Sequence, residues 1–236
     1  MEYYTLLLLG CIVGMQHALE ADHLAAVAAM SAGKTSRKAV MLRGGIWGLG
    51  HTITLLSICG ILLVFGESIS PQTESLLEFF VGIMLILLGA NVLASIWKRK
   101  LHIHFHQHQD GVTHIHAHSH LSNNSSDTRD LHKHEHTNIG LKRSLLIGMV
   151  HGAAGSAGML VLAAAANSLG NALGFIIAFG AGSILGMTVL SFVASYPLQV
   201  LERGARWLNL VTTASIGCIA LIIGSLRLLE NWSALS

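Results

Sequence analysis

Six long apolar stretches restrict this chain to one kind of fold. Each is long enough for the roughly 20 residues that a helix needs to cross the hydrocarbon core of a bilayer. Only 11% of the residues are charged, whereas a soluble domain has about 25%. We therefore predict an all-α integral membrane protein with six transmembrane helices, over residues 4–30, 39–65, 76–97, 145–167, 169–196 and 207–229.

The basic residues indicate how these helices are oriented. If alternate links face the cytoplasm, 13 of the 14 Lys and Arg residues lie on that side, and only Arg227 lies on the other. Cytoplasmic links of membrane proteins carry such an excess of Lys and Arg. The distribution predicts a multi-pass protein of the cell (inner) membrane, with both termini outside and the long polar insert after the third helix in the cytoplasm.

The two halves of the chain are similar to each other. Gly-Met-Gln-His at 14–17 recurs as Gly-Met-Val-His at 148–151, an offset of 134. Trp-Gly-Leu-Gly at 47–50 corresponds to Phe-Gly-Ala-Gly at 179–182, and Gly82, Gly89 and Trp97 correspond to Gly217, Gly224 and Trp232. Three spans per half require the second half to be inverted, as in many secondary transporters. We predict a 3+3 inverted repeat, with repeats at 1–97 and 144–236 and a histidine-rich loop at 98–143.

Ionisable side chains lie near the middle of these apolar segments. The first span contains His17, Glu20, Asp22 and His23, and two later spans contain His51 and His151. A charged group at the bilayer centre costs about 2.5–3.5 kcal/mol by insertion scales, so such residues are usually functional. Imidazole nitrogen and carboxylate oxygen together are typical ligands of Zn, Ni and Co. A divalent cation is the partner that explains the whole set.

One straight helix cannot supply the whole site. His17 and Asp22 lie about 140° apart around an ideal helix, and His17 and His23 are separated by a rise of about 9 Å. Either the helix opens locally or neighbouring helices bring in His51 and His151. Other roles stay open: His151 could form an interhelical hydrogen bond, Asp22 could orient an imidazole, and Glu20 could pair internally or face a water-filled path.

The first two polar motifs resemble those of the nickel/cobalt transporter family (NiCoT and the wider NicO group). The match consists of His17, four residues and then Asp22-His23, followed by Gly-Leu-Gly-His51-Thr on the next helix. The resemblance implies that His17, Asp22 and His23 recognise Ni²⁺ or Co²⁺, with His51 nearby. Importers of that family carry eight spans with the signature in the second. Six spans with the signature in the first resemble the shorter efflux-type and urease-associated members.

The polar insert is rich in histidine. Alternating imidazoles suit loose, exchangeable binding of borderline divalent metals, and the polar Ser/Asn-rich neighbourhood predicts a disordered loop. Efflux members of the resembled family have a similar loop, which favours efflux slightly, although metal buffering serves either direction. The predicted buffering residues are His102, His104, His106, His108, His114, His116, His118, His120, His132, His134 and His136.

These patterns favour secondary transport of Ni²⁺ or Co²⁺. The metal is then a substrate, and no permanently bound cofactor, catalytic residue or nucleic-acid partner is expected; the partners are divalent metal ions and the bilayer. One alternative is an intramembrane zinc-dependent hydrolase, although the spacing of His17, Glu20 and His23 is not that of an HExxH motif. A membrane metal sensor, or an accessory factor for a metalloenzyme such as urease, is the other alternative.

Overall fold

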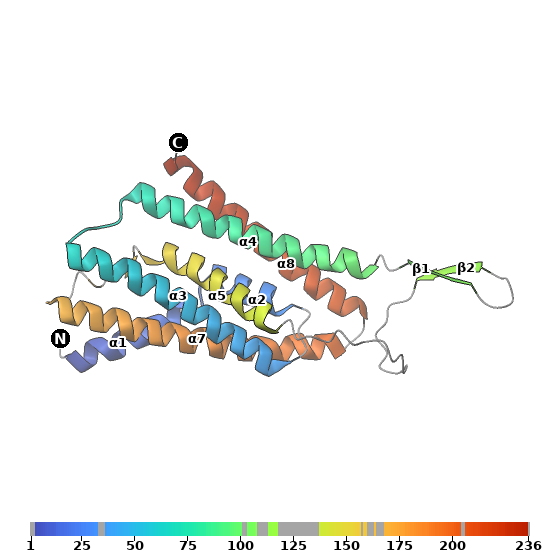
Figure 1. Cartoon of the computed structure of the whole chain (residues 1–236), viewed down its shortest axis with the longest axis horizontal. Coiled ribbons are helices and arrows are strands. Elements are labelled where there is room, and N and C mark those ends of the chain that lie inside the picture. Colours follow the sequence, from blue (N-terminus) through green and yellow to red (C-terminus); the bar gives the residue numbers. More distant parts are fainter. Residues whose placement is uncertain are drawn as a thin grey trace.

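The computed structural model describes residues 3–32, 36–100, 103–107, 113–117, 137–156, 158–159, 163, 168–203 and 206–235. It is a bundle of helices with a small two-stranded hairpin at one end (Figure 1). Helix α1 begins and helix α8 finishes at the end of the molecule opposite the hairpin.

The first predicted span is not one helix. It consists of α1 (Tyr3–His17) and α2 (Ala21–Ser31), which are bent by 59° relative to each other. The two turn bonds from the backbone N–H groups of Leu19 and Glu20 to the carbonyls of Gln16 and His17 end α1. Of the two possibilities left open by the helix geometry, a local opening of the first span is therefore present. The break lies within the polar motif, so the motif supplies both a helix end and a helix start.

Four longer helices form the rest of the bundle together with α5 (Thr137–Ala154). Helices α3 (Arg37–Phe65) and α4 (Pro71–Lys100) precede the insert, and α7 (Leu169–Arg203) and α8 (Arg206–Leu235) follow α5. The main packed pairs are α1 with α7, α3 with α5, α3 with α7, and α4 with α8. The short helix α2 packs against α4, α7 and α8.

Glycines allow the backbones of α3 and α5 to approach closely. A Cβ atom at Gly148 would overlap the carbonyl oxygen of Trp47, and one at Gly152 would overlap that of His51. Small residues at helix interfaces are a common means of tight packing in membranes. This contact fixes the height of His51 on α3 relative to His151 on α5.

The outer surface is that of a membrane protein. Large apolar side chains are exposed along the bundle, including Leu8, Ile61, Leu87, Ile177 and Ile222. A continuous apolar exterior of this kind is unusual for a soluble monomer and suits contact with lipid. Burial is confined to the packed helix faces, where Trp47, Leu55, Leu85 and Ile176 are fully covered.

Fewer than six spans are recognised in the described part of the chain. Four helices, α3, α4, α7 and α8, are long and apolar enough to cross a membrane, and the bent pair of α1 and α2 makes up to five. The fourth expected span, 145–167, coincides with α5 only as far as Ala154, and much of its remainder lies outside the described residues.

The insert contains regular structure where disorder was expected. Strands β1 (Ile103–Gln107) and β2 (Thr113–Ala117) pair antiparallel, with His104 opposite His116 and His106 opposite His114. Their alternation of apolar or polar residues with histidine has the period of a strand, which the prediction of a disordered loop overlooked. His102, His108, His118, His120, His132, His134 and His136 lie outside the described residues.

Candidate metal centre

The structure brings the intramembrane histidines together from four helices. His17 ends α1, His23 lies in the first turn of α2, His51 is in the middle of α3, and His151 is in the last turn of α5. His23, His51 and His151 are each at least 97% buried, with exposed fractions of 1%, 0% and 3%. Residues from both halves of the chain thus lie close together in the bundle.

Two carboxylates each contact one imidazole through its Nδ1 atom. Glu20 Oε1 lies 2.7 Å from Nδ1 of His17, and Asp22 Oδ1 lies 2.9 Å from Nδ1 of His23. Asp22 Oδ1 also accepts the backbone N–H of His23 at 2.8 Å. A carboxylate on one ring nitrogen fixes the imidazole and leaves the other nitrogen available for a metal. Here the Nε2 atoms of both histidines are buried and have no hydrogen-bond partner in the described part of the chain.

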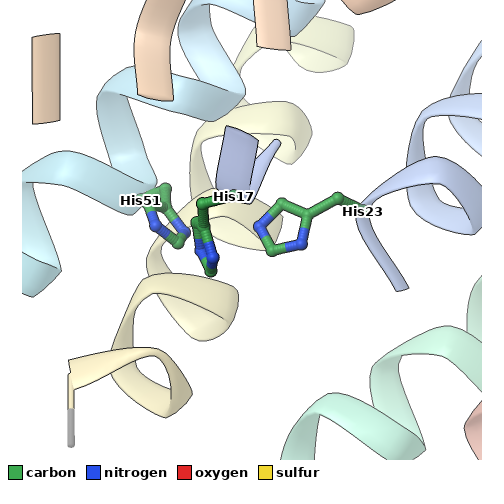
Figure 2. A group of neighbouring side chains, drawn as sticks. All are labelled: His17, His23 and His51. Carbon is green, nitrogen blue, oxygen red and sulfur yellow. The ribbon is translucent and has the colours of Figure 1, made fainter. Parts of the chain in front are cut away.

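His17, His23 and His51 form the first group of potential ligands (Figure 2). One nitrogen from each ring lies within 4.8 Å of the other two. The ring centroid of His17 lies 4.5 Å from that of His23 and 5.2 Å from that of His51. Three imidazoles that share a small volume form a ligand set suited to Ni, Co or Zn.

Asp22, His23 and His151 form a second group that shares His23 with the first. The ring centroids of His23 and His151 are 4.1 Å apart. His151 Nε2 lies 3.4 Å from Asp22 Oδ2, but it does not have the geometry of a hydrogen bond. Asp22 therefore orients His23 through Oδ1 and directs Oδ2 towards the second group.

His51 and His151 carry polar atoms that stand out among the described residues. Both ring nitrogens of each residue are buried without a hydrogen-bond partner among the described residues. An unsatisfied buried polar group costs about 1–3 kcal/mol, and such groups are rare in native structures. A bound cation is the partner that would satisfy several of these nitrogens at once.

Two helix C-termini converge on the same point. Helix α1 ends at His17, and α5 carries His151 in its last turn. The last carbonyl groups of a helix carry the negative end of its dipole, which favours a cation within about one turn. This electrostatic contribution requires the break between α1 and α2, since a continuous helix would have no C-terminus at His17.

Aromatic rings enclose the histidines. Trp47 and Phe179 are almost fully buried, and their ring centroids lie 5.4 Å from His23 and 5.3 Å from His17, respectively. These rings exclude water from the sides of the site and lower the local dielectric constant, which strengthens electrostatic interactions with a bound ion. The corresponding positions 47 and 179 of the two halves therefore flank the same cluster.

An acidic cavity adjoins the site. It has a volume of about 640 Å³ and is lined by His17, Glu20, Glu74 and Glu78, together with apolar residues of α1 and α7 and residues after α5. Glu20 thus has both of the roles left open by the sequence, because it contacts His17 and faces a cavity.

Sequence reasoning missed Arg227 and Glu78. Arg227 Nη2 lies 3.3 Å from Asp22 Oδ2, and its Nη1 lies 3.5 Å from Glu78 Oε2. Arg227 was noticed only as the one basic residue on the outer side of the predicted topology, and Glu78 only as part of an outer link. Their proximity to Asp22 depends on how α4 and α8 pack around α2.

Comparison with known proteins gives one informative match. No family model and no solved structure matches the chain. The chain is 31% identical over 212 residues to the urease accessory protein UreH of Bacillus sp. (strain TB-90), and the match covers 87% of this chain and 82% of that protein. The chain belongs to the family of the urease accessory protein UreH.

Proposed function

We propose that this protein is a secondary transporter of Ni²⁺ or Co²⁺. The observation that carries the proposal is the cluster of His17, His23, His51 and His151, in which six buried ring nitrogens have no hydrogen-bond partner where the structure describes their surroundings. A divalent ion bound by these imidazoles and Asp22 would exchange its water shell for protein ligands. Nothing else in the described site would balance the burial of so many polar atoms.

Two residues adjust the site without being its main ligands. Asp22 fixes the ring of His23 and presents a second oxygen to the cation, and Glu20 fixes the ring of His17 from the side of the cavity. The acidic cavity is the aqueous access from the outer face in the predicted topology. The carboxylates of Glu74 and Glu78 raise the local concentration of cations, because a cleft lined by charges of one sign attracts ions of the opposite sign.

The architecture that suits this function is the 3+3 inverted repeat of six spans, with repeats at 1–97 and 144–236 and the loop between them. Contacts of the bundle support it. A contact that a residue of the first half makes with the second half recurs between the corresponding residues, with the two halves exchanged. Gly14 packs on the backbone of Phe179, whereas the corresponding Gly148 packs on that of Trp47. Gly50 meets Leu145, and the corresponding Gly182 meets Cys11.

Helices α4 and α8 repeat this relationship about one axis. Gly82 approaches the carbonyl oxygen of Gly224, and Gly89 approaches that of Gly217. Because 82 corresponds to 217 and 89 to 224, exchanging the halves returns the same pair of contacts. A site at the axis between two such halves can be exposed alternately by rocking one half against the other.

The histidine-rich loop would hold metal ions at the cytoplasmic end. The backbone register of the hairpin sets residue 104 opposite 116 and residue 106 opposite 114, and all four are histidines. Such sites would load an exporter or collect the ions that an importer delivers.

The relative named as a urease accessory protein favours one variant of this function. A membrane protein that supplies metal to a metalloenzyme is an accessory protein by its effect, even when its own activity is transport. A purely accessory role without transport is the second candidate, and it predicts metal binding without flux.

Flux measurements in liposomes test the proposal. Purified protein is reconstituted with a metal-sensitive dye inside, and Ni²⁺ or Co²⁺ is added outside. We expect flux that is abolished by His51→Ala, while His104→Ala, the same substitution in the hairpin, retains it. Metal binding without flux in the wild-type protein would reject transport and favour the accessory role. Reversed gradients, combined with cellular metal content, establish the direction, for which the loop slightly favours efflux.

A further inference from the structure

Arg227 is a basic side chain that reaches the candidate metal centre. It extends from α8 and contacts two carboxylates, Asp22 Oδ2 through Nη2 at 3.3 Å and Glu78 Oε2 through Nη1 at 3.5 Å. The three side chains come from α8, α2 and α4. The exposed fractions of the side chains differ, at 6% for Asp22, 24% for Glu78 and 34% for Arg227. Arg227 therefore connects the buried site with the cavity that Glu78 lines.

The guanidinium group and a bound cation need the same oxygen atom. Asp22 Oδ1 is used by the ring and backbone of His23, so Oδ2 is the oxygen that faces the second group of ligands. A metal ion on a carboxylate oxygen lies about 2.1 Å from it. Added to the 3.3 Å between Oδ2 and Nη2, this places the ion at most about 5.4 Å from the guanidinium nitrogen. Two positive charges this close in a buried site repel each other strongly.

We propose that Arg227 is a tethered competitor of the transported cation. It neutralises Asp22 when no cation is bound, and it transfers to Glu78 when the cation takes Asp22 Oδ2. This inference rests on the proposed transport function. Glu78 is already 3.5 Å from the other guanidinium nitrogen, so the transfer needs a small movement of a long side chain.

The exchange provides a route for releasing a tightly held ion. A site with several imidazoles and a carboxylate binds a divalent cation well but releases it slowly unless something replaces the ion. Return of Arg227 to Asp22 supplies that replacement and keeps the buried carboxylate paired in the empty carrier. An unpaired buried carboxylate would be strongly unfavourable.

Two substitutions of opposite expected effect test the inference. Ni²⁺ binding to the purified full-length protein is measured by isothermal titration calorimetry. Arg227→Gln removes the competitor, and we expect the Kd to fall about tenfold. Glu78→Gln removes the alternative partner of Arg227, which holds the guanidinium on Asp22, so we expect the Kd to rise severalfold. Arg227→Lys keeps the charge and should remain close to wild type.

Matched controls remove the same charges elsewhere. Lys142 and Glu67 are exposed, and Lys142→Gln and Glu67→Gln should leave the Kd unchanged. In liposomes, Arg227→Gln should lower both the KM and the maximal rate, because tighter binding slows release. A purely structural role would raise the KM or reduce the amount of folded protein instead.

The outcomes separate this inference from the function on which it rests. If the wild-type protein does not bind Ni²⁺ or Co²⁺, the proposed function fails, and the inference fails with it. If the wild-type protein binds and transports the metal but Arg227→Gln leaves the Kd unchanged or raises it, only the competition is overturned. Effects of the same sign for Arg227→Gln and Glu78→Gln would also overturn it.

Discussion

Asp22 and His23 are consecutive residues whose side chains contact each other, with Oδ1 of the carboxylate 2.9 Å from Nδ1 of the imidazole. The same oxygen accepts the backbone N–H of His23, so the carboxylate is held by two contacts in the first turn of α2. The ring of His23 is thereby fixed with its Nε2 atom free and buried. His23 belongs to both groups of potential ligands, and its orientation links them.

Asp22→Asn should weaken metal binding by about 10- to 100-fold, the usual effect of removing a carboxylate that orients a metal-binding histidine. The amide preserves the shape of the side chain but removes the charge that faces His151 and Arg227. Calorimetric titration with Ni²⁺ measures the change. Glu230→Gln, an exposed carboxylate on α8, is the control and should bind like the wild-type protein. Wild-type affinity in Asp22→Asn would contradict the role given to this carboxylate.

His51→Leu should separate stability from metal binding. Leucine has a similar size and removes two buried nitrogens that lack partners in the described structure, so the metal-free protein should melt at the wild-type temperature or higher. A saturating metal stabilises a wild-type protein by about 2.7 kcal/mol at 100 times its Kd. Thermal melting with and without Ni²⁺ should show this shift in the wild type and its loss in the variant. A retained shift would exclude His51 as a ligand.

Gly152→Ala should destabilise the contact between α3 and α5. A Cβ atom at this position would overlap the backbone of His51, and forced overpacking costs about 1–3 kcal/mol. The melting temperature of the detergent-solubilised protein should fall, and Ni²⁺ binding should weaken because His51 and His151 are displaced.

Gly60→Ala on α3, the partner helix in that contact, is the comparison for that substitution. Nothing lies within 4 Å of a Cβ atom at Gly60. Alanine favours a helix over glycine by about 0.5–1 kcal/mol, so this variant should melt at the wild-type temperature or above. Equal losses for both variants would show that the close approach at Gly152 is not the cause.

The hairpin should bind metal through its opposed histidines. Replacing His104 and His106 by Ala should lower the metal stoichiometry of the purified protein as much as replacing all four of His104, His106, His114 and His116, because each opposed pair loses one member. Flux through the membrane should persist. Gln107→Ala with Thr113→Ala alters an opposed pair without histidine and should leave the stoichiometry unchanged. If the metal stoichiometry instead falls further with each histidine that is replaced, the four histidines bind metal independently and not as opposed pairs.

Some expectations depended only on local composition, and these are confirmed in their coarse form. Apolar runs near 37–65, 71–97, 169–197 and 207–232 form long helices because length and hydropathy are properties of a segment by itself. The polar heptad that begins at His17 was singled out for a similar reason, since ionisable groups in a hydrocarbon layer require a partner wherever the helix lies. That this segment binds a metal stays a prediction.

The position of the break in the first span could not be read from the sequence, although helix geometry had left a local opening as one of two possibilities. The break after His17 has no Gly or Pro to announce it, since residues 18–20 are Ala, Leu and Glu. It is stabilised by tertiary contacts, in which the buried histidines of α3 and α5 meet the end of α1 and the start of α2. Local propensity favours a continuous helix there, and packing overrides it.

The sequence by itself determined that this chain is an all-α membrane protein with ionisable residues in its apolar segments, because both properties follow from which residues each segment contains. The local contacts of Glu20 with His17 and of Asp22 with His23 were among the possibilities that the sequence left open, and the structure shows both. The contact of Asp22 with Arg227 joins residues 205 positions apart, and Glu78 reaches the same guanidinium group from another helix; both depend on how the helices pack rather than on a local pattern.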